Sequence, residues 1–133
     1  MVDAVTVRVT EDGPKYHVVK INNISDATGE SAVVKVDAST IEGPEGPGTN
    51  PSYFAIVSCE WAIQGMTRVD ILFDATSPVP ALLLNPGNGY ADFAGVFFND
   101  PQATGTTGDI KLTTTGALSD GSYEITLKLI KKA

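Results

Sequence analysis

Hydrophobic and polar residues alternate along most of this chain, which is the period-two pattern of β-strands that bury one face. The clearest inward-facing row lies near the end of the chain and consists of Tyr123, Ile125, Leu127 and Leu129. Similar rows predict strands over residues 5–10, 15–22, 31–37, 53–63, 67–74, 81–84, 90–98 and 109–115. No window of a dozen residues repeats at the helical period. The pattern therefore predicts eight or nine short strands and no long helix.

Local details follow from the same alternation. In the strand predicted over residues 31–37, Val34 and Val36 fall on one face and Lys35 falls on the other. The preceding segment, residues 22–30, is rich in Asn, Asp, Ser and Gly, so it is predicted to be a polar connection rather than a strand. Residues 86–89, which contain one proline and two glycines, are predicted to form a turn.

Glycine and proline separate the predicted strands. Residues 41–51 (IEGPEGPGTNP) contain three of each, which predicts an exposed irregular loop, called the Gly/Pro loop below. Residues 99–108 form a second long polar loop. Many short strands separated by turns indicate two packed antiparallel sheets. We therefore expect an all-β, antiparallel β-sandwich of eight or nine strands with jelly-roll-like connections. The length of 133 residues predicts one domain, residues 1–133.

Charge is distributed unevenly along the chain. The net charge is −7, and residues 37–110 hold nine acidic side chains but one basic side chain, Arg68. A protein that binds nucleic acid needs a basic stripe to displace counterions from phosphate, so no nucleic-acid partner is expected. No apolar run has the length of a signal peptide or a membrane span, so no membrane partner is expected either.

Residues capable of chemistry are few. The one histidine, His17, and the one cysteine, Cys59, both lie in alternating strands, which predicts structural roles. Asp70 and Asp74 share a strand face, but such acids are usually solvated rather than paired for glycoside hydrolysis. The chain has no nucleophile-elbow or P-loop motif. We therefore expect no enzyme activity, no catalytic residue, no metal ligand and no cofactor.

Two binding alternatives stay open at this point. Loops rich in oxygen ligands can hold calcium, and one loop is flanked by Asn99, Asp100 and Asp109. Trp61 and the four tyrosines could form an aromatic platform for a sugar, as in carbohydrate-binding β-sandwiches. However, Trp61 shares its strand face with Cys59 and Ile63, and packing in the core explains that position more simply.

Three stretches carry a family resemblance: residues 22–37 (NNISDATGESAVVKVD), 107–114 (TGDIKLTT) and 121–131 (GSYEITLKLIK). Together with residues 70–76 (DILFDAT), they resemble small virion structural proteins of tailed bacteriophages, particularly marine and cyanobacterial phages. The likeness follows the order of the chain over nearly its whole length, although the Gly/Pro loop departs from the family pattern.

The resemblance implies a capsid decoration (cement) protein, which binds the outside of the shell and stabilises it without catalysis. The implied partner is the major capsid protein, and the implied state is a homo-oligomer such as a trimer. The implied location is the capsid surface of the virion, after assembly in the host cytoplasm. Two alternatives are another virion module (head-completion, tail or fibre-associated) and a carbohydrate-binding β-sandwich.

The predicted contact residues lie in the N-terminal strand and in the two longest loops. Chain ends and long loops are the segments that are most free to reach a partner. These residues are Val5, Val7, Glu42, Pro44, Glu45, Pro47, Asn50, Asn99, Asp100 and Thr106.

Overall fold

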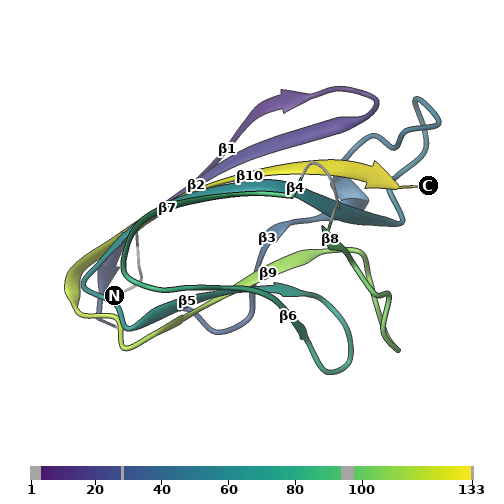
Figure 1. Ribbon diagram of the computed structural model, residues 1–133. Coiled ribbons are helices and arrows are strands. Elements are labelled where there is room, and N and C mark those ends of the chain that lie inside the picture. The colour runs from purple at the N-terminus through teal and green to yellow at the C-terminus, as the bar shows by residue number, and fades with distance from the viewer. Residues whose placement is uncertain (1–3, 28, 94–97, 133) are drawn as a thin grey trace.

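Two antiparallel β-sheets packed face to face make up the fold in the computed structural model, which describes residues 4–27, 29–93 and 98–132 (Figure 1). The larger sheet has the strand order β1-β2-β10-β4-β7, and β8 also pairs with β4. Its strands are β1 (Ala4–Asp12), β2 (Tyr16–Asp26), β4 (Tyr53–Gln64), β7 (Gly87–Asp92), β8 (Phe98–Asn99) and β10 (Ser119–Lys132). The smaller sheet, in the order β3-β9-β5-β6, consists of β3 (Val33–Val36), β9 (Ile110–Thr115), β5 (Arg68–Phe73) and β6 (Val79–Leu84).

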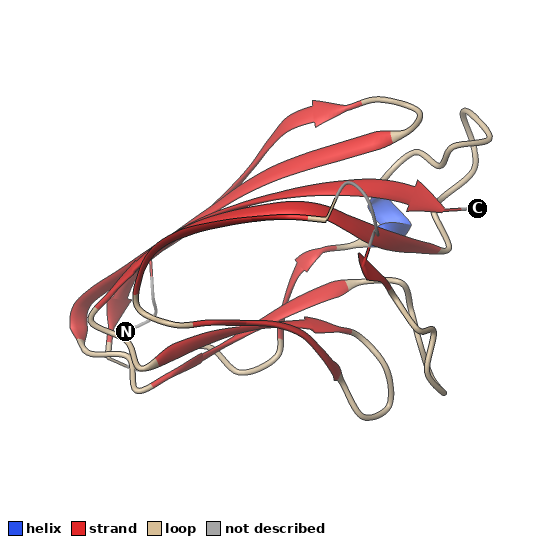
Figure 2. Cartoon of the chain, in the orientation of Figure 1, coloured by secondary structure: helices blue, strands red, loops and turns tan. Residues whose placement is uncertain are grey.

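The predicted all-β, antiparallel β-sandwich is confirmed (Figure 2). Nine of the described strands have four residues or more, and β8 has two, which is close to the eight or nine strands predicted. The jelly-roll-like connection of the strands stays a prediction. One short helix, η1 (Ala38–Thr40), appears in the described residues. No helix found in these ranges is long and apolar enough to cross a membrane.

The core lies between the sheets and is filled by the predicted inward rows. The four residues of the β10 row are each 2% exposed or less. They form one buried cluster with side chains of both sheets, among them Ile21, Phe54, Ile56, Cys59, Val69, Ile71, Phe73, Ile110 and Leu112. Burying one such aliphatic or aromatic side chain contributes about 1.5–3 kcal/mol. This contiguous core fixes the two sheets against each other and therefore fixes the loops that join them.

The prediction of a polar connection over residues 22–30 is wrong for its first half. Strand β2 continues through Asn22–Asp26 and pairs with β1 on one side and β10 on the other. Asn23 and Ser25 are 1% and 3% exposed, because they continue the inward alternation of Val19 and Ile21. The polar composition of this segment therefore concealed a buried strand.

The predicted facing of β3 is also wrong. A bulge between Val34 and Val36 interrupts its pairing with β9, so the two valines do not share a face. Val36 is 2% exposed, whereas Val34 is 42% exposed. Lys35 is buried instead, and its ammonium group pairs with the buried carboxylate of Glu30. A buried ion pair thus replaces the expected outward lysine.

Strand β7 begins earlier than the sequence pattern indicates. Residues 87–89, predicted as part of a turn, pair with Trp61 and its neighbours on β4. The turn is reduced to the two residues between β6 and β7. The bulge expected at Gly95, within the strand predicted over residues 90–98, lies outside the described residues.

Candidate functional site

Several segments that are distant in the sequence meet at one end of the sandwich, called the loop end (Figure 1). They are the β1–β2 turn, the Gly/Pro loop, the β5–β6 turn, residues 99–109 and the end of β10. Backbone hydrogen bonds tie them together: the Thr76 N–H donates to the Thr104 carbonyl (3.0 Å), and the Ser52 N–H donates to the Lys132 carbonyl (2.8 Å). Both long loops predicted to contact a partner therefore present their side chains at the same end.

Eight of the predicted contact residues belong to the loop end, and most of them are accessible. The exposed ones are Glu42, Glu45, Pro47, Asn50 and Asn99, and the half-buried ones are Pro44 and Thr106. Asp100 differs, because it is 4% exposed and its carboxylate accepts a hydrogen bond from the Gln102 N–H (2.8 Å). Asp100 supports its loop from inside in the isolated chain, and contact with a partner stays a prediction for all eight.

The Gly/Pro loop is held by its own hydrogen bonds despite its irregular sequence. The Gly43 N–H donates to the Thr49 carbonyl (2.8 Å), and the Thr49 N–H and hydroxyl both donate to the Gly46 carbonyl (3.2 and 2.6 Å). The Asn50 amide donates to the Ile41 carbonyl (2.8 Å). Together with the fixed φ angles of Pro44 and Pro47, these bonds give the loop a defined shape before any partner binds.

Lys131 anchors the Gly/Pro loop to the rest of the loop end. Its side chain is 1% exposed, and its ammonium group donates to the Asp12 carboxylate (2.5 Å) and to the Glu42 carbonyl (2.6 Å). The buried His17 ring lies 3.2 Å from the same Asp12 oxygen. Burial opposes ionisation of Asp12, but the hydrogen bonds from Lys131 and His17 outweigh it and lower the pKa of this carboxyl. One buried lysine thus connects β1, β10 and the loop.

The aspartates near the loop end differ in the direction in which the fold shifts their pKa. Hydrogen bonds from Thr107 and Lys111 lower the pKa of Asp74. Burial raises the pKa of Asp100 and of Asp109, and a hydrogen bond from a backbone N–H only partly offsets it in each. One carboxylate oxygen of Asp100 is buried without a hydrogen-bond partner among the described residues. No group of three or more His, Cys, Asp or Glu side chains in those residues is arranged to hold a metal ion.

The substitution Asp100→Asn is expected to stabilise the protein at neutral pH by about 1 kcal/mol, because it removes a buried charge while keeping the acceptor for the Gln102 N–H. The pKa of Asp100 is higher in the folded chain than in the unfolded chain. Below both pKa values the carboxyl is protonated in both states and does not affect stability, whereas above them its buried charge destabilises the folded chain. The gain should therefore be present at pH 7 and vanish near pH ~3. Urea unfolding of both proteins at the two pH values measures it.

The exposed Glu45, replaced by Gln, is the matched control and should change stability by less than about 0.5 kcal/mol at both pH values. An Asp100→Asn protein that gains equally at both pH values would show that the charge of Asp100 is not the cause.

The acids considered for glycoside hydrolysis have separate partners. Asp70 lies 2.6 Å from the Arg68 guanidinium, and Asp74 lies 2.9 Å from the Lys111 ammonium group. The arrangement is that of two ion pairs on the smaller sheet.

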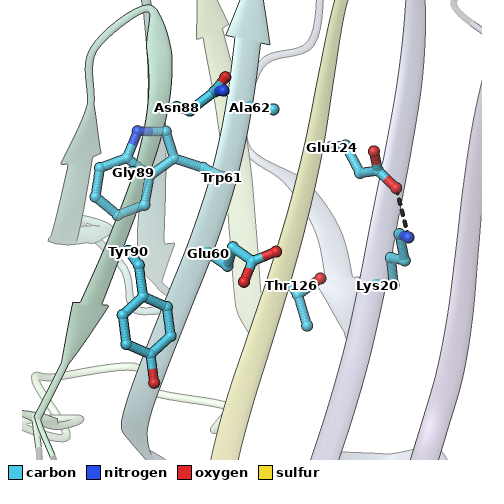
Figure 3. Close-up of a pocket in the computed structure, with 9 residues that line it drawn as sticks. All are labelled: Lys20, Glu60, Trp61, Ala62, Asn88, Gly89, Tyr90, Glu124 and Thr126. Carbon is cyan, nitrogen blue, oxygen red and sulfur yellow. Dashed lines mark ion pairs between the residues drawn. The ribbon is translucent and has the colours of Figure 1, made fainter.

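The outer face of the larger sheet carries a shallow depression of about 520 Å³ (Figure 3). Lys20 and Glu124 form an ion pair across it (2.5 Å), and Glu60 and Tyr90 point from the two neighbouring strands. Tyr90 is 61% exposed. This surface combines charged side chains with apolar and aromatic ones and is open to solvent.

Trp61, the residue considered for a sugar platform, packs toward the core. It is half-buried against the main hydrophobic cluster, as the packing interpretation predicts, and it also contributes to the lining of the outer depression near Tyr90. Its indole also covers Gly89 of β7, where a Cβ atom would lie only 2.2 Å from the ring. The glycine therefore provides the space for the indole on this edge strand.

The two remaining predicted contact residues, Val5 and Val7, lie on β1 at the edge of the larger sheet. They are 38% and 44% exposed, and neighbouring Val9 is 51% exposed. The strand is correctly predicted, but its valines are less covered than those of the other inward rows, because the smaller sheet does not extend over β1. Contact of these valines with a partner stays a prediction.

These surfaces belong to an antiparallel β-sandwich that presents ordered loops at one end and an open strand at one edge. Comparison with protein-family models, with curated proteins and with solved structures finds no match.

Sequence reasoning missed two residues that organise the structure, Glu30 and Lys131. Lys131 lies two residues after Leu129, so it continues the alternation of the inward β10 row, and this position in the alternation predicts that its side chain is buried. Glu30 lies outside any strand, and no periodic pattern marks it.

Proposed function

We propose that this chain is a non-enzymatic structural protein of a tailed-bacteriophage virion, which binds the outside of the capsid shell as a decoration (cement) protein. The observation that carries the proposal is the loop end, where a two-sheet scaffold holds two long loops at the same end of the sandwich. The family resemblance of residues 22–37, 107–114 and 121–131 supplies the identity of the partner, the major capsid protein.

The loop end has the physical properties that attachment to a shell requires. Its loops are already hydrogen-bonded, so ordering them on binding costs little conformational entropy. Its exposed acids Glu42 and Glu45 favour a basic surface on the partner and disfavour other acidic surfaces. Many copies on a symmetric shell multiply individually weak contacts.

The decisive experiment dissociates purified particles of the phage that encodes this chain and measures its copy number relative to the shell protein. A decoration protein occurs at a fixed ratio to the shell protein, and electron density places it on the outer shell surface. Absence from the particle would reject the proposal. Density at a vertex or at the tail would support the other virion modules, and binding to a glycan array without binding to particles would support a carbohydrate-binding module.

Replacing both Pro44 and Pro47 with glycine is expected to weaken attachment to undecorated particles by roughly tenfold. The two glycines free the φ angles of the exposed loop, which then loses more entropy on binding, while the core remains intact. Co-sedimentation with particles measures the affinity, and thermal unfolding checks the fold.

The substitution Pro86→Gly, in the β6–β7 link at the other end of the sandwich, is the matched control and should leave attachment unchanged (Figure 1). Unchanged affinity of the double variant would remove the Gly/Pro loop from the interface.

A further inference from the structure

Strand β1 carries an apolar row, Val5, Val7 and Val9, that is exposed although it lies on the core side of the larger sheet. Val7 pairs with Ile21 and Val9 pairs with Val19, so both point to the core side of the sheet. Ile21 and Val19 are 0% and 1% exposed, whereas Val7 and Val9 are 44% and 51% exposed. The groove beside them, about 260 Å³, runs between β1 and the Val36–Ile41 side of the smaller sheet. The sandwich is therefore open along this edge.

The other edges of the two sheets are protected in ways that β1 is not. Natural sheets blunt their edges with proline, short strands and bulges, because an unpaired edge invites another strand. Edge strand β6 contains Pro80, and β3 has four residues and a bulge. Strand β7 contains two glycines, which weaken pairing. Strand β1 has nine residues, no proline or glycine, and a bulge only near its end, between Val9 and Glu11.

We propose that β1 pairs with β1 of a second copy of this chain, antiparallel and across a two-fold axis at Val7, so that one sheet continues through both copies. This pairing places Val7 opposite itself and Val5 opposite Val9 of the second copy. Six valines from two copies then form one apolar row on the core side. The inference concerns contacts between copies and is independent of the proposed attachment to a shell.

Charge is compatible with pairing about Val7 and disfavours the neighbouring register about Arg8. On the outer side, pairing about Val7 sets Thr6 opposite Arg8 of the second copy, with no like charges facing each other between Val5 and Val9. Pairing about Arg8 would set the two arginines directly opposite each other, which is destabilising. The alternating segment can thus pair with itself about Val7 with valines opposite valines and no like charges opposite each other within residues 5–9.

Cysteine substitutions test the register directly. In the proposed dimer the two side chains at position 7 are about 5 Å apart at Cβ, within reach of a disulfide, whereas those at position 5 are roughly 14 Å apart. Under mild oxidation, Val7→Cys should cross-link to itself, and Val5→Cys or Val9→Cys alone should not. A mixture of Val5→Cys and Val9→Cys should cross-link across the pair. Native Cys59 does not interfere, since it is fully buried and its pKa is raised to about 12.

Sedimentation equilibrium of the isolated chain at about 100 µM should give twice the monomer mass. The substitution Val7→Glu should return it to the monomer, because two carboxylates would face each other at the axis. Leu118→Glu replaces another exposed apolar side chain away from β1 and should leave the dimer intact. Circular dichroism confirms folding of each variant.

Three results would overturn the proposal. One is a monomeric or trimeric mass for the native chain. The second is cross-linking of Val7→Cys no faster than Val5→Cys. The third is preferential cross-linking of a Val7→Cys and Val9→Cys mixture, which would indicate pairing about Arg8.

Discussion

The substitution Glu30→Gln is expected to lower the free energy of unfolding by about 3 kcal/mol and the Tm by roughly 10 °C. Both side chains of the Glu30–Lys35 ion pair are buried, at 6% and 3% exposure. Glutamine keeps the shape of the side chain but leaves the Lys35 ammonium group buried without a counter-charge. Breaking a buried pair in this way costs far more than losing an exposed one, because water cannot replace the missing partner.

Glu30 is also the point at which both sheets are joined by polar contacts. Its carboxylate accepts hydrogen bonds from the Asn23 amide of β2 (2.8 Å) and the Tyr123 hydroxyl of β10 (2.5 Å). Its backbone N–H donates to the Thr114 hydroxyl of β9 (2.8 Å). Residues from three separate segments, 22–37, 107–114 and 121–131, therefore converge on this one residue.

Thermal and urea unfolding measure the loss, with Glu45→Gln at an exposed position as the control. The double variant Glu30→Gln with Lys35→Met should be more stable than Glu30→Gln alone, since it removes the unpaired charge while glutamine still accepts the bonds from Asn23 and Tyr123. A single variant within about 0.5 kcal/mol of the parent would mean that the buried pair contributes nothing to stability.

Apolar alternation predicted the fold because it reports directly on burial in a two-sheet core. The row of β10 was predicted residue by residue, and β5 and β9 were predicted from similar rows, since the alternating apolar side chains of these strands face the other sheet. The same parity extends to Asn23, Ser25 and Lys131, which are buried although they are polar. Composition argued against burial at these positions, and only their tertiary partners make it favourable.

The candidate site was predictable in its parts but not in its arrangement. Glycine, proline and polar residues identified both long loops, because residues of these types favour turns and exposed loops over strands. Their meeting at one end depends on the strand order, which pairs β4 with β10 in the larger sheet and β9 with β3 and β5 in the smaller sheet, all through contacts between residues distant in the sequence. The exposure of Val7 likewise depends on the smaller sheet ending before it reaches β1, which no local pattern records.

The substitution Gly108→Ala is expected to destabilise the protein by about 3 kcal/mol and to weaken attachment to the shell. Gly108 has φ +81°, and a Cβ atom there would lie 2.2 Å from the Ser52 carbonyl oxygen. Ser52 cannot retreat easily, because its N–H is bonded to the Lys132 carbonyl (2.8 Å). The added methyl group must therefore push residues 99–109 away from the end of the Gly/Pro loop.

Gly48 provides a matched control for this prediction. Its φ of +84° is nearly the same, but a Cβ atom there would have no heavy atom within 4 Å. Gly48→Ala should cost only the backbone strain, about 1–2 kcal/mol, so the difference between the two variants isolates the contact with Ser52. Urea unfolding measures the difference, and co-sedimentation with particles measures attachment at a temperature where both variants are folded. Equal losses in the free energy of unfolding for the two variants would mean that the contact between position 108 and Ser52 does not hold the two loops against each other. A folded Gly108→Ala protein that attaches normally would contradict the proposal that the fixed spacing of the loops makes the contact with the shell.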